Sequence, residues 1–381
     1  MLRVGTRNAR FQQFQALLGN RAKRQRNREF LVQGVRPITL AAEFGWPFRA
    51  LLYDAERPLS AWARTMLRDV PALQVAMSPA LLAELGEKEA GPPELVAVVG
   101  MPDDDLDRIT AGPGFLGVVL DRPASPGNVG SIIRSADAFG ADGIIVTGHA
   151  ADVYDPRAVR ASTGSLFARP VVRAPSHREV ADWVMAQRAR GCPMVLAGTD
   201  EHGETDVFDA DFTQPALLLV GNETTGLTSA WRDLCDLVVR IPITGAASSL
   251  NAANAATAVL YEITRQRLLA ARSLSASLAL PGGSCRGVCR WSALAAGCPR
   301  GGNRGYAADE GAETGCQGPK RRDRDPHREI GPAGDGGWRG RLLGRRRRGW
   351  GDRRRGRDGG RWRWRRRSMA ARRRYEGQDE C

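Results

Sequence analysis

Two polar residues in one short stretch of the chain could take part in chemistry. Residues 120–148 read LDRPASPGNVGSIIRSADAFGADGIIVTG, in which an apolar run, a Pro/Gly loop, a helical segment and a second apolar run form the pattern of a βαβ unit. Asn128 stands where its side chain would cap the helix by accepting a hydrogen bond from an unpaired backbone N–H. Arg134 follows six residues later, outside the apolar stripe of that helix. It is therefore either a solvated surface charge or a group that contacts a ligand.

A second set of polar residues follows a buried strand. Residues 217–227 read LLLVGNETTGL, so an apolar run leads directly to Gly221, Asn222 and Glu223. Open α/β sheets bind ligands at the carboxyl ends of their strands, which is where these residues would lie. From this segment alone, ordinary hydrogen bonding within a loop explains Asn222 and Glu223 equally well.

A third stretch, residues 240–267, joins a strand to a long Ala-rich helix through a loop of small residues, 245–248. Small residues let a ligand approach the backbone closely, and the first N–H groups of a helix are free to donate hydrogen bonds. Ser249 and Asn251 open this helix. Ser249 is its N-cap, a ligand contact or both.

The apolar runs that precede these loops predict a parallel sheet. From Phe115 onward, the runs FLGVVL, GIIVTG, PMVLAG, ALLLVG and LVVRIPI lack the alternation of half-exposed strands and are typical of strands buried on both faces. We expect helices over residues 128–140, 157–166, 176–190 and 249–267. The expected fold is a doubly wound α/β domain over residues 115–272, with no cluster of metal ligands.

Residues 1–105 predict a separate, smaller α/β domain. We expect strands over residues 29–33, 48–53, 73–76 and 95–99, and helices over residues 8–18, 34–44, 59–68 and 79–85. This part has no Cys or His and no recognisable pair of catalytic carboxylates, so we interpret it as a binding or positioning domain. Residues 101–114 read MPDDDLDRITAGPG, which is acidic and then Gly/Pro-rich, and we expect residues 106–114 of this stretch to form a linker.

Basic residues are unevenly distributed along the chain. The net charge is +14, but residues 273–381 hold 27 of the 56 Lys and Arg residues and only 12 of the 42 Asp and Glu residues. The first 272 residues are therefore close to neutral. A basic arm near the N-terminus is a better candidate for contact with RNA phosphates than the overall charge, although a solvated helix face would look the same. The candidates are Arg7, Arg10, Arg21, Lys23, Arg24, Arg26 and Arg28.

Residues 273–381 have a different composition from the rest of the chain. They contain 22 of the 44 glycines and long arginine runs, so we expect a disordered Arg/Gly-rich tail. Tryptophans among the arginines suit stacking on RNA bases. The same mixture arises when a GC-rich gene is read out of frame, and we favour a non-native tail. Its cysteines lack the spacing of a zinc site.

Cysteine usage and hydropathy indicate the compartment. Only Cys192 and Cys235 lie in the expected folded part, which fits a reducing environment. No run approaches about 18 consecutive apolar residues, and the first residues lack the apolar region of a signal peptide. We therefore expect a cytoplasmic protein with no membrane partner.

Together, the three stretches resemble the motifs of the SpoU, or TrmH-like, branch of the SPOUT RNA methyltransferases. Motif one is PGNVGSIIRSADAFGADGIIV, motif two is LLLVGNETTGL and motif three is IPITGAASSLNAANAATAVLYE. The order and spacing of all three are more specific than any single glycine motif. Residues 1–105 resemble the L30e-like substrate-binding domain that often precedes this catalytic domain.

The resemblance implies a trefoil-knotted α/β domain with a parallel sheet, an exception to the rule that chains avoid knots. It also implies a homodimer that transfers a methyl group from S-adenosylmethionine to a ribose 2′-hydroxyl of rRNA or tRNA, without a metal. The residues on the family's catalytic positions are Asn128, Arg134, Glu223, Ser249 and Asn251. The residues expected to line the cofactor or lie beside it are Thr147, Gly148, Gly221, Asn222, Ile241 and Leu250.

Two other functions are compatible with the sequence. One is a non-catalytic RNA-binding or ribosome-assembly protein on the same fold, and the other is a base methyltransferase. The combination of Asn128 and Arg134 with the SLN sequence at 249–251 speaks against a base methyltransferase. Intact Asn128, Arg134, Glu223 and Asn251 speak against a non-catalytic protein. The role of Arg134 is also open. The resemblance implies a general base, but a guanidinium is effectively always protonated, so a clamp for phosphate and developing alkoxide charge is the alternative.

Overall fold

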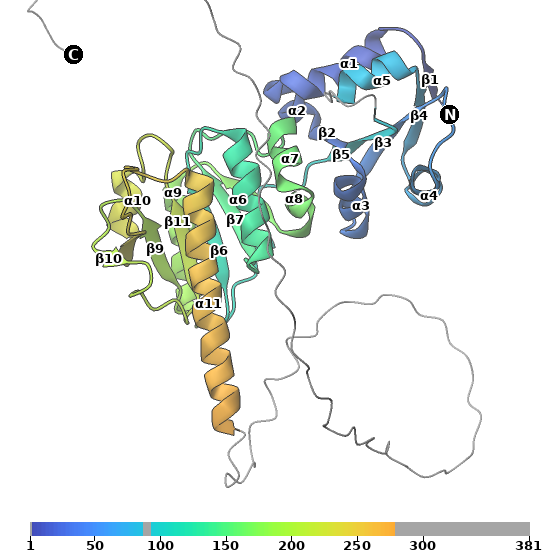
Figure 1. The fold of residues 1–381 in the computed structure, drawn as a ribbon. Coiled ribbons are helices and arrows are strands. Elements are labelled where there is room, and N and C mark those ends of the chain that lie inside the picture. The colour runs from blue at the N-terminus through green and yellow to red at the C-terminus, as the bar shows by residue number, and fades with distance from the viewer. Residues whose placement is uncertain (1, 87–92, 279–381) are drawn as a thin grey trace, which may run out of the picture. The chain divides into compact units, whose positions relative to one another are not determined.

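The computed structural model describes residues 2–86 and 93–278 (Figure 1). Within this part, the chain forms two sheets that follow one another in sequence. Of the tail predicted over residues 273–381, residues 279–381 with the cysteines lie outside the described residues, and residues 273–278 belong to a helix instead of a disordered segment.

The N-terminal sheet has five strands in the order β1-β4-β3-β5-β2. Strand β5 runs antiparallel to β2 and β3, and the remaining pairs are parallel. The strands are β1 (Leu2–Val4), β2 (Glu29–Gln33), β3 (Phe48–Asp54), β4 (Leu73–Met77) and β5 (Leu95–Gly100). The helices are α1 (Ala9–Gly19), α2 (Arg21–Asn27), α3 (Val35–Glu43), α4 (Ala61–Asp69) and α5 (Pro79–Gly86). The small α/β architecture expected from the sequence is therefore present.

Two elements of this N-terminal part did not follow from the sequence pattern. Strand β1 is only three residues long, and it forms by pairing with β4. Helix α2 reads RAKRQRN, which has no apolar periodicity. It forms because the side chain of Asn20 caps it at Lys23 N–H, and because Arg24 is buried. Pairing with β4 therefore specifies β1, whereas α2 combines a local cap with the tertiary burial of Arg24.

The second sheet has seven strands in the order β10-β12-β9-β11-β6-β7-β8, and every neighbouring pair is parallel. The strands are β6 (Leu116–Asp121), β7 (Gly143–Thr147), β8 (Val171–Ala174), β9 (Val195–Thr199), β10 (Thr205–Asp206), β11 (Ala216–Val220) and β12 (Leu237–Arg240). The predicted parallel sheet is confirmed. The short strands β8 and β10 were not predicted, because neither forms a recognisable apolar run.

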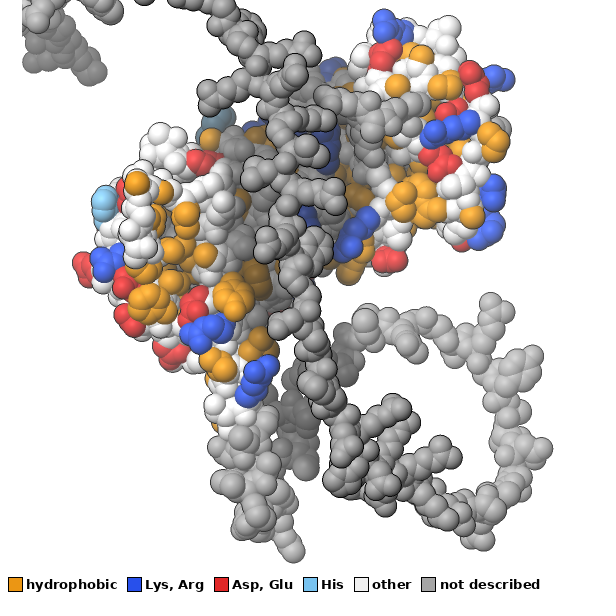
Figure 2. Space-filling model, viewed as in Figure 1, with side chains coloured by type: hydrophobic (Ala, Val, Ile, Leu, Met, Phe, Trp, Pro, Cys, Tyr) orange, Lys and Arg blue, Asp and Glu red, His pale blue; other side chains and the backbone are white. Residues whose placement is uncertain are grey.

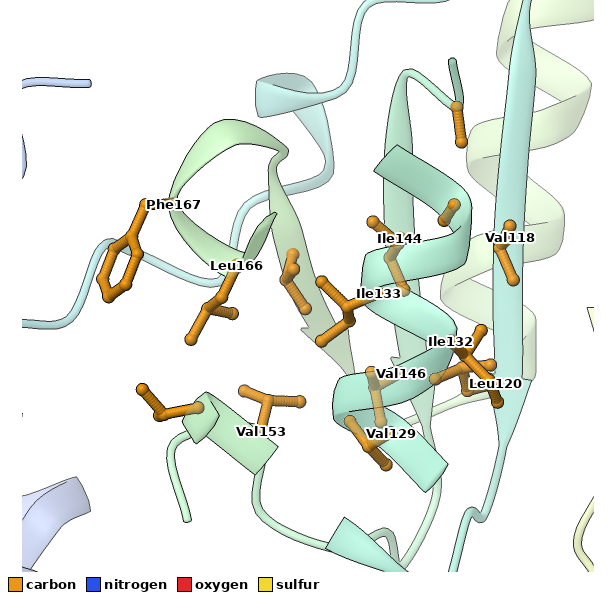
Figure 3. Packing of buried hydrophobic residues seen from close by; sticks show 14 of the residues in the cluster. Val118, Leu120, Val129, Ile132, Ile133, Ile144, Val146, Val153, Leu166 and Phe167 are labelled. Carbon is orange, nitrogen blue, oxygen red and sulfur yellow. The ribbon is translucent and has the colours of Figure 1, made fainter. Parts of the chain in front are cut away.

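Helices cover both faces of the seven-stranded sheet. They are α6 (Pro126–Ala138), α7 (Pro156–Ser162), α8 (Ser165–Ala168), α9 (His177–Ala189), α10 (Ser229–Leu234) and α11 (Ala252–Leu278). Leu218 and Val220 of β11 share one buried cluster with apolar residues of α6 and α11, whereas Leu217 and Leu219 share another with those of α9. Alternate residues of one strand thus pack on opposite layers. Figure 3 shows the α6 side chains facing those of β6 and β7.

Several predicted boundaries differ from the observed ones. The helix expected over 157–166 divides into α7 and α8 at Thr163 and Gly164, both of which have positive φ. The expected linker contains the 3-10 helix η1 (Leu106–Arg108), and Ile109 after it is buried in the core. Helix α11 continues to Leu278, beyond the domain end expected at Arg272. Helix α10 was not predicted.

The parallel arrangement brings the three sequence motifs to one edge of the sheet. Strands β6 and β11 are neighbours, so the loops after Asp121 and Val220 leave side by side. Strand β9 separates β12 from β11 in the sheet. The helix that follows β12, α11, nevertheless packs against α6, which follows β6 (Figure 1). The segment 241–251 must therefore cross the carboxyl edge of the sheet. The trefoil knot expected from the resemblance stays a prediction.

No helix of the described ranges is long and apolar enough to span a membrane.

The close packing of α6 on α7 generates a stability prediction. A Cβ at Gly130 would lie 2.2 Å from the backbone oxygen of Ala158, so Gly130→Ala forces the two helices apart. We expect a loss of about 1–3 kcal/mol in the free energy of unfolding, measured by denaturant titration.

The matched control lies in the same helix. A Cβ at Gly127 meets its nearest atom at an ordinary 3.7 Å, so Gly127→Ala should be neutral or slightly stabilising. Equal stability of the two variants would contradict the packing argument.

Candidate functional site

Helix α6 begins two residues before the position expected from the sequence. Ser125 is its N-cap, and Pro126 occupies the first helical position, where its missing N–H costs nothing. The Ser125 hydroxyl accepts a hydrogen bond from the backbone N–H of Asn128 at 3.4 Å. The prediction that Asn128 caps the helix is therefore wrong. Its side-chain amide is left free to bond with other loops.

The loop after β11 is closed by its own backbone. Asn222 and Gly226 exchange two N–H to O hydrogen bonds of 3.0 and 2.9 Å. A Cβ at Gly221 would lie 2.4 Å from the backbone of Gly226 and Leu227, so only glycine fits this turn. The side chain of Asn222 donates to the carbonyl of Arg122 at 2.7 Å. Asn222 thus fastens the second motif to the first.

Asn251 opens the last helix and at the same time contacts the first motif. Its Oδ1 accepts from the backbone N–H of Ala253 at 2.9 Å, which is the geometry of an N-cap. Its Nδ2 donates to Oδ1 of Asn128 at 3.1 Å. Ser249 is exposed and α11 begins three residues later, so the structure does not give Ser249 the capping role.

Glu223 is the acceptor on which these contacts converge. Its Oε1 accepts from Nδ2 of Asn128 at 2.9 Å and from the N–H of Ser125 at 3.1 Å, and its Oε2 accepts from the N–H of Ala124 at 2.8 Å. The residues Glu223, Asn128 and Asn251 form a continuous hydrogen-bonded chain, which we call the motif cluster. Three predicted site residues from three separate motifs thus meet.

The environment of Glu223 sets its charge. Partial burial by itself would raise the pKa of this carboxyl, but the hydrogen bonds from Ala124, Asn128 and Ser125 outweigh it and lower the pKa below its ordinary value. Glu223 is therefore ionised at neutral pH and a weak proton acceptor. The geometry gives it a positioning role.

Two residues at the end of β6 were missed by the sequence analysis. Asp121 is buried, and its Oδ2 accepts from the backbone N–H of Thr228 at 3.0 Å. Arg122 has a positive φ of 52° and donates to the carbonyl of Gly226 at 3.2 Å. A non-glycine residue in this conformation is uncommon and is held by its surroundings. No sequence pattern identifies Asp121 or Arg122, because their roles depend on contacts with the loop after β11.

The residues predicted to hold the cofactor occupy different environments. The Thr147 side chain is buried and within 3.4 Å of both Asp121 and the indole N–H of Trp231, so it supports the edge from beneath. Gly148 is exposed just beyond it, with a φ of 67°. Ile241 is partly buried against the core. Leu250 is 42% exposed.

The segment that contains Leu250 suits a ligand with apolar and polar parts. Residues 242–250 are exposed, and they donate no hydrogen bond to the rest of the described chain. Free N–H groups beside an exposed leucine fit a nucleoside cofactor, which needs an apolar surface and donors. Across the described ranges, no cluster of three or more His, Cys, Asp or Glu residues could hold a metal ion.

Arg134 lies apart from the motif cluster. It is exposed on α6, six residues after Asn128 and thus about 9 Å further along the helix on another face. The neighbouring Ser135 bonds to Thr257 of α11 at 2.7 Å, which fixes this part of α6. Arg134 therefore presents a solvent-facing charge on a rigid support.

The basic arm divides into residues with structural contacts and residues that face solvent. Arg24 is 1% exposed and paired with Asp152, so its predicted contact with RNA is not supported. Arg7 pairs with Glu84, and Arg28 pairs with Asp103. Arg21 donates to the carbonyl of Ala150.

The remaining three basic residues share one groove. Arg10, Lys23 and Arg26 line a hollow of about 480 Å³ between α1 and α2, together with Gln12, Gln13 and Asn27. Amide and cationic donors around a groove suit the phosphate and sugar groups of a nucleic acid.

Known proteins resemble both parts of the chain. Residues 8–97 match the SpoU L30e-like domain, and residues 116–261 match the SpoU rRNA Methylase family. A 23S rRNA (uridine(2479)-2′-O)-methyltransferase from Streptomyces viridochromogenes is 69% identical over 266 residues, which are 70% of this chain and 93% of that protein.

Two solved methyltransferase structures are also similar to this chain. The crystal structure of the SpoU methyltransferase AviRb from Streptomyces viridochromogenes, in complex with AdoMet, is 70% identical with a TM-score of 0.67, and the match covers 69% of this chain and 99% of that chain. The AdoMet-bound rRNA methyltransferase from Sinorhizobium meliloti is 31% identical with a TM-score of 0.61, over 69% of this chain and 97% of that chain.

The lowered pKa of Glu223 generates a pH-dependent prediction. An ionised Glu223 adds stability above its ordinary pKa, and this contribution is lost as the pH falls through the lowered value. In Glu223→Gln, one accepting oxygen becomes a donor that faces an N–H group. We expect a loss of about 1 kcal/mol in unfolding free energy at pH 7, measured by denaturant titration.

The difference between Glu223→Gln and the unchanged protein should shrink as the pH is lowered below the ordinary carboxyl range. Glu43→Gln, at an exposed carboxylate at the end of α3, is the control and should leave stability unchanged at pH 7. A destabilisation by Glu223→Gln that is independent of pH would contradict the assigned ionisation.

Proposed function

The chain belongs to the SpoU family and is an S-adenosylmethionine-dependent RNA ribose 2′-O-methyltransferase, and we propose that its substrate is a uridine of 23S rRNA. The observation that carries the proposal is the motif cluster, in which Asn128, Glu223 and Asn251 meet from three loops. The relative that is 69% identical and named for 23S rRNA supports the choice of RNA and nucleotide.

The reaction sets three demands on the protein. S-adenosylmethionine supplies an electrophilic methyl group on a positively charged sulfur. The 2′-oxygen, the methyl carbon and the sulfur must lie in line, the 2′-hydroxyl proton must leave, and charge that develops on the oxygen must be stabilised. The products are a 2′-O-methylated ribose, S-adenosylhomocysteine and a proton. Alignment and charge stabilisation are tasks for fixed polar side chains.

We assign the motif cluster to alignment. Asn128 has its donor and its acceptor committed to Glu223 and Asn251, so the three side chains form one rigid unit. Rigid hydrogen-bonded groups keep a site in its reactive geometry without reorganisation. Ser249 and Leu250 lie on the exposed segment just before Asn251, where they would contact the nucleotide and the cofactor.

We assign the cofactor to the edge formed by the ends of β7, β11 and β12. Gly148 and the Gly221–Asn222 turn offer backbone groups, and Ile241 and Leu250 offer apolar surface. Thr147 supports this edge from below. In the knotted arrangement that we propose, segment 241–251 crosses the edge and encloses the cofactor.

We assign charge stabilisation to Arg134. An arginine side chain keeps its proton at neutral pH, so it is a poor base but a good partner for phosphate and developing alkoxide charge. Its exposed position on α6 is accessible to the backbone of an RNA strand.

We propose that residues 1–105 form the substrate-binding domain and residues 115–278 the catalytic domain, joined by residues 106–114. The α1–α2 groove, with Arg10, Lys23 and Arg26, would contact RNA phosphates. We place the enzyme in the cytoplasm, where ribosomes are assembled.

We also propose a homodimer formed through α11. Tyr261, Leu268 and Leu269 on this helix are 58%, 55% and 46% exposed. Figure 2 shows hydrophobic side chains on the face that the second sheet's domain presents in this view. Apolar side chains grouped on a helix at the surface are typical of a protein interface.

The substrate prediction is tested with purified protein, S-adenosylmethionine and three RNAs: 23S rRNA, 16S rRNA and bulk tRNA. We expect methyl transfer to 23S rRNA alone, and protection of one phosphodiester bond from alkali, because alkaline cleavage needs a free 2′-hydroxyl. Methylation without that protection would indicate a base methyltransferase.

An arginine variant tests the catalytic role of Arg134 in the same assay. Arg134→Ala should lower kcat by about 10²-fold or more while the protein still binds S-adenosylmethionine in calorimetry. Arg178→Ala, at an exposed arginine of α9 on the other face of the sheet, should retain wild-type kcat. Wild-type kcat in folded Arg134→Ala would refute the assignment, and no cofactor binding by the unchanged protein would favour a non-catalytic role.

The homodimer is tested by sedimentation. A double variant, Leu268→Glu with Leu269→Glu, should sediment as a monomer because two charges would have to be buried in the interface. Met185→Glu, at a 62% exposed residue of α9, should remain a dimer. A monomeric unchanged protein would exclude the proposed assembly.

A further inference from the structure

Arg24 of α2 is a buried arginine whose partners lie far away in sequence. Its Nε donates to Oδ2 of Asp152 at 2.9 Å, and its Nη2 is 2.8 Å from the same oxygen. Its Nη1 donates to the carbonyls of Leu17 and Leu18 at 2.8 and 2.7 Å. Asp152 is itself only 4% exposed. A buried and fully bonded guanidinium cannot bind RNA, so its role lies within the chain.

The partner of Arg24 belongs to the segment that leaves the candidate cofactor edge. Residues 148–155 connect β7 to α7, and we call them the β7–α7 segment. Arg21, one turn before Arg24 on α2, donates to the carbonyl of Ala150 at 2.7 Å. Arg24 also lies 3.7 Å from Oδ2 of Asp155. Helix α2 therefore holds this segment through ion pairs of Arg24 with Asp152 and Asp155 and through the hydrogen bond of Arg21.

The β7–α7 segment in turn holds the first catalytic loop. The N–H of Ala151 donates to the carbonyl of Pro123 at 2.7 Å. The next two residues, Ala124 and Ser125, donate their N–H groups to Glu223. Three successive hydrogen-bonded steps thus connect α2 with the motif cluster.

The N-terminal part is packed against this region rather than tethered to it. The indole of Trp46 donates to the carbonyl of Phe167 at 3.0 Å, and the rings of Phe30 and Tyr154 are 4.7 Å apart. A Cβ at Gly164 would lie 2.5 Å from Leu40. This dense contact leaves little freedom for α2 to move relative to the β7–α7 segment.

We infer that Arg21 and Arg24 are positioning residues for catalysis: through the β7–α7 segment they hold the Pro123–Ser125 loop against Glu223. The substrate-binding domain is then a fixed part of the catalytic site and not only an RNA-binding arm. This inference uses the proposed reaction for its kinetic readout. Small displacements of aligned groups reduce the rate of a displacement reaction strongly, whereas they affect substrate affinity less.

The test combines steady-state kinetics on 23S rRNA with amide hydrogen exchange of the RNA-free protein. Arg21→Met removes one hydrogen bond without leaving a buried charge, so it should fold. Arg24→Met leaves the buried Asp152 without its ion pair, so it should disturb the segment more than Arg21→Met and also lower the stability of the protein more. Arg3→Met, at an exposed arginine on β1 of the same domain, is the matched control.

For Arg21→Met, and for the folded fraction of Arg24→Met, we expect kcat to fall by about tenfold or more while KM for RNA stays within about twofold. Exchange should become faster at the amides of Ala124, Ser125 and Ala151, which make the connecting hydrogen bonds. Arg3→Met should change neither quantity.

Two outcomes would overturn the inference. One is a raised KM with unchanged kcat and exchange, which would make Arg21 an RNA contact. The other is a lower unfolding midpoint with wild-type kcat per folded molecule and unchanged exchange, which would leave a structural role only. If the unchanged protein did not methylate 23S rRNA, the proposed substrate would fail, and the exchange data would still decide whether α2 holds the loop.

Discussion

The site depends on one carboxylate that satisfies three donors. Glu223 accepts hydrogen bonds from two consecutive backbone N–H groups, Ala124 and Ser125, and from the side chain of Asn128. Those N–H groups precede or cap a helix and have no intrahelical partner, so an ionised acceptor stabilises both the loop and the helix start. Among the described residues, the other hydrogen bonds between the ends of β6 and β11 come from Arg122, Asn222 and the Asp121–Thr228 pair. The negative charge of Glu223 and its position between the two loops are therefore both needed to join the loops at this edge of the sheet.

Glycine makes the same edge possible. The turn at Gly221 brings two backbone segments within a distance that excludes any side chain, and Gly130 does the same for α6 and α7. Close backbone approach lets short side chains such as Asn128 and Asn251 bridge between motifs. The rigidity that catalysis needs comes from these close approaches and from the core beneath them.

The distribution of arginines shows why composition is a poor guide to RNA binding in this protein. Of the seven basic candidates in the first thirty residues, Arg7, Arg24 and Arg28 form ion pairs within the chain, and Arg21 donates to a backbone carbonyl. Arg10 and Arg26 are exposed, Lys23 is half-buried, and all three line the groove. Counterion release on RNA binding depends on such free charges, so fewer of the seven candidates are available for the proposed RNA contact than the sequence suggests.

The sequence alone determined the parallel sheet, most helices and the three motifs, because apolar runs and helical periodicity are local signals. It also identified Asn128, Glu223 and Asn251, which the structure joins. It misplaced the cap of α6 and missed β1, α2, Arg122 and the Arg24–Asp152 pair. The cap of α6 is a local choice between Ser125 and Asn128. The other features depend on contacts between segments that are distant in sequence: α2 has no apolar stripe, and Arg24 and Asp152 are separated by more than a hundred residues. The tertiary structure decided these features. A short segment such as α2 has no strong local preference for helix, strand or loop, so burial and long-range hydrogen bonds determine its conformation.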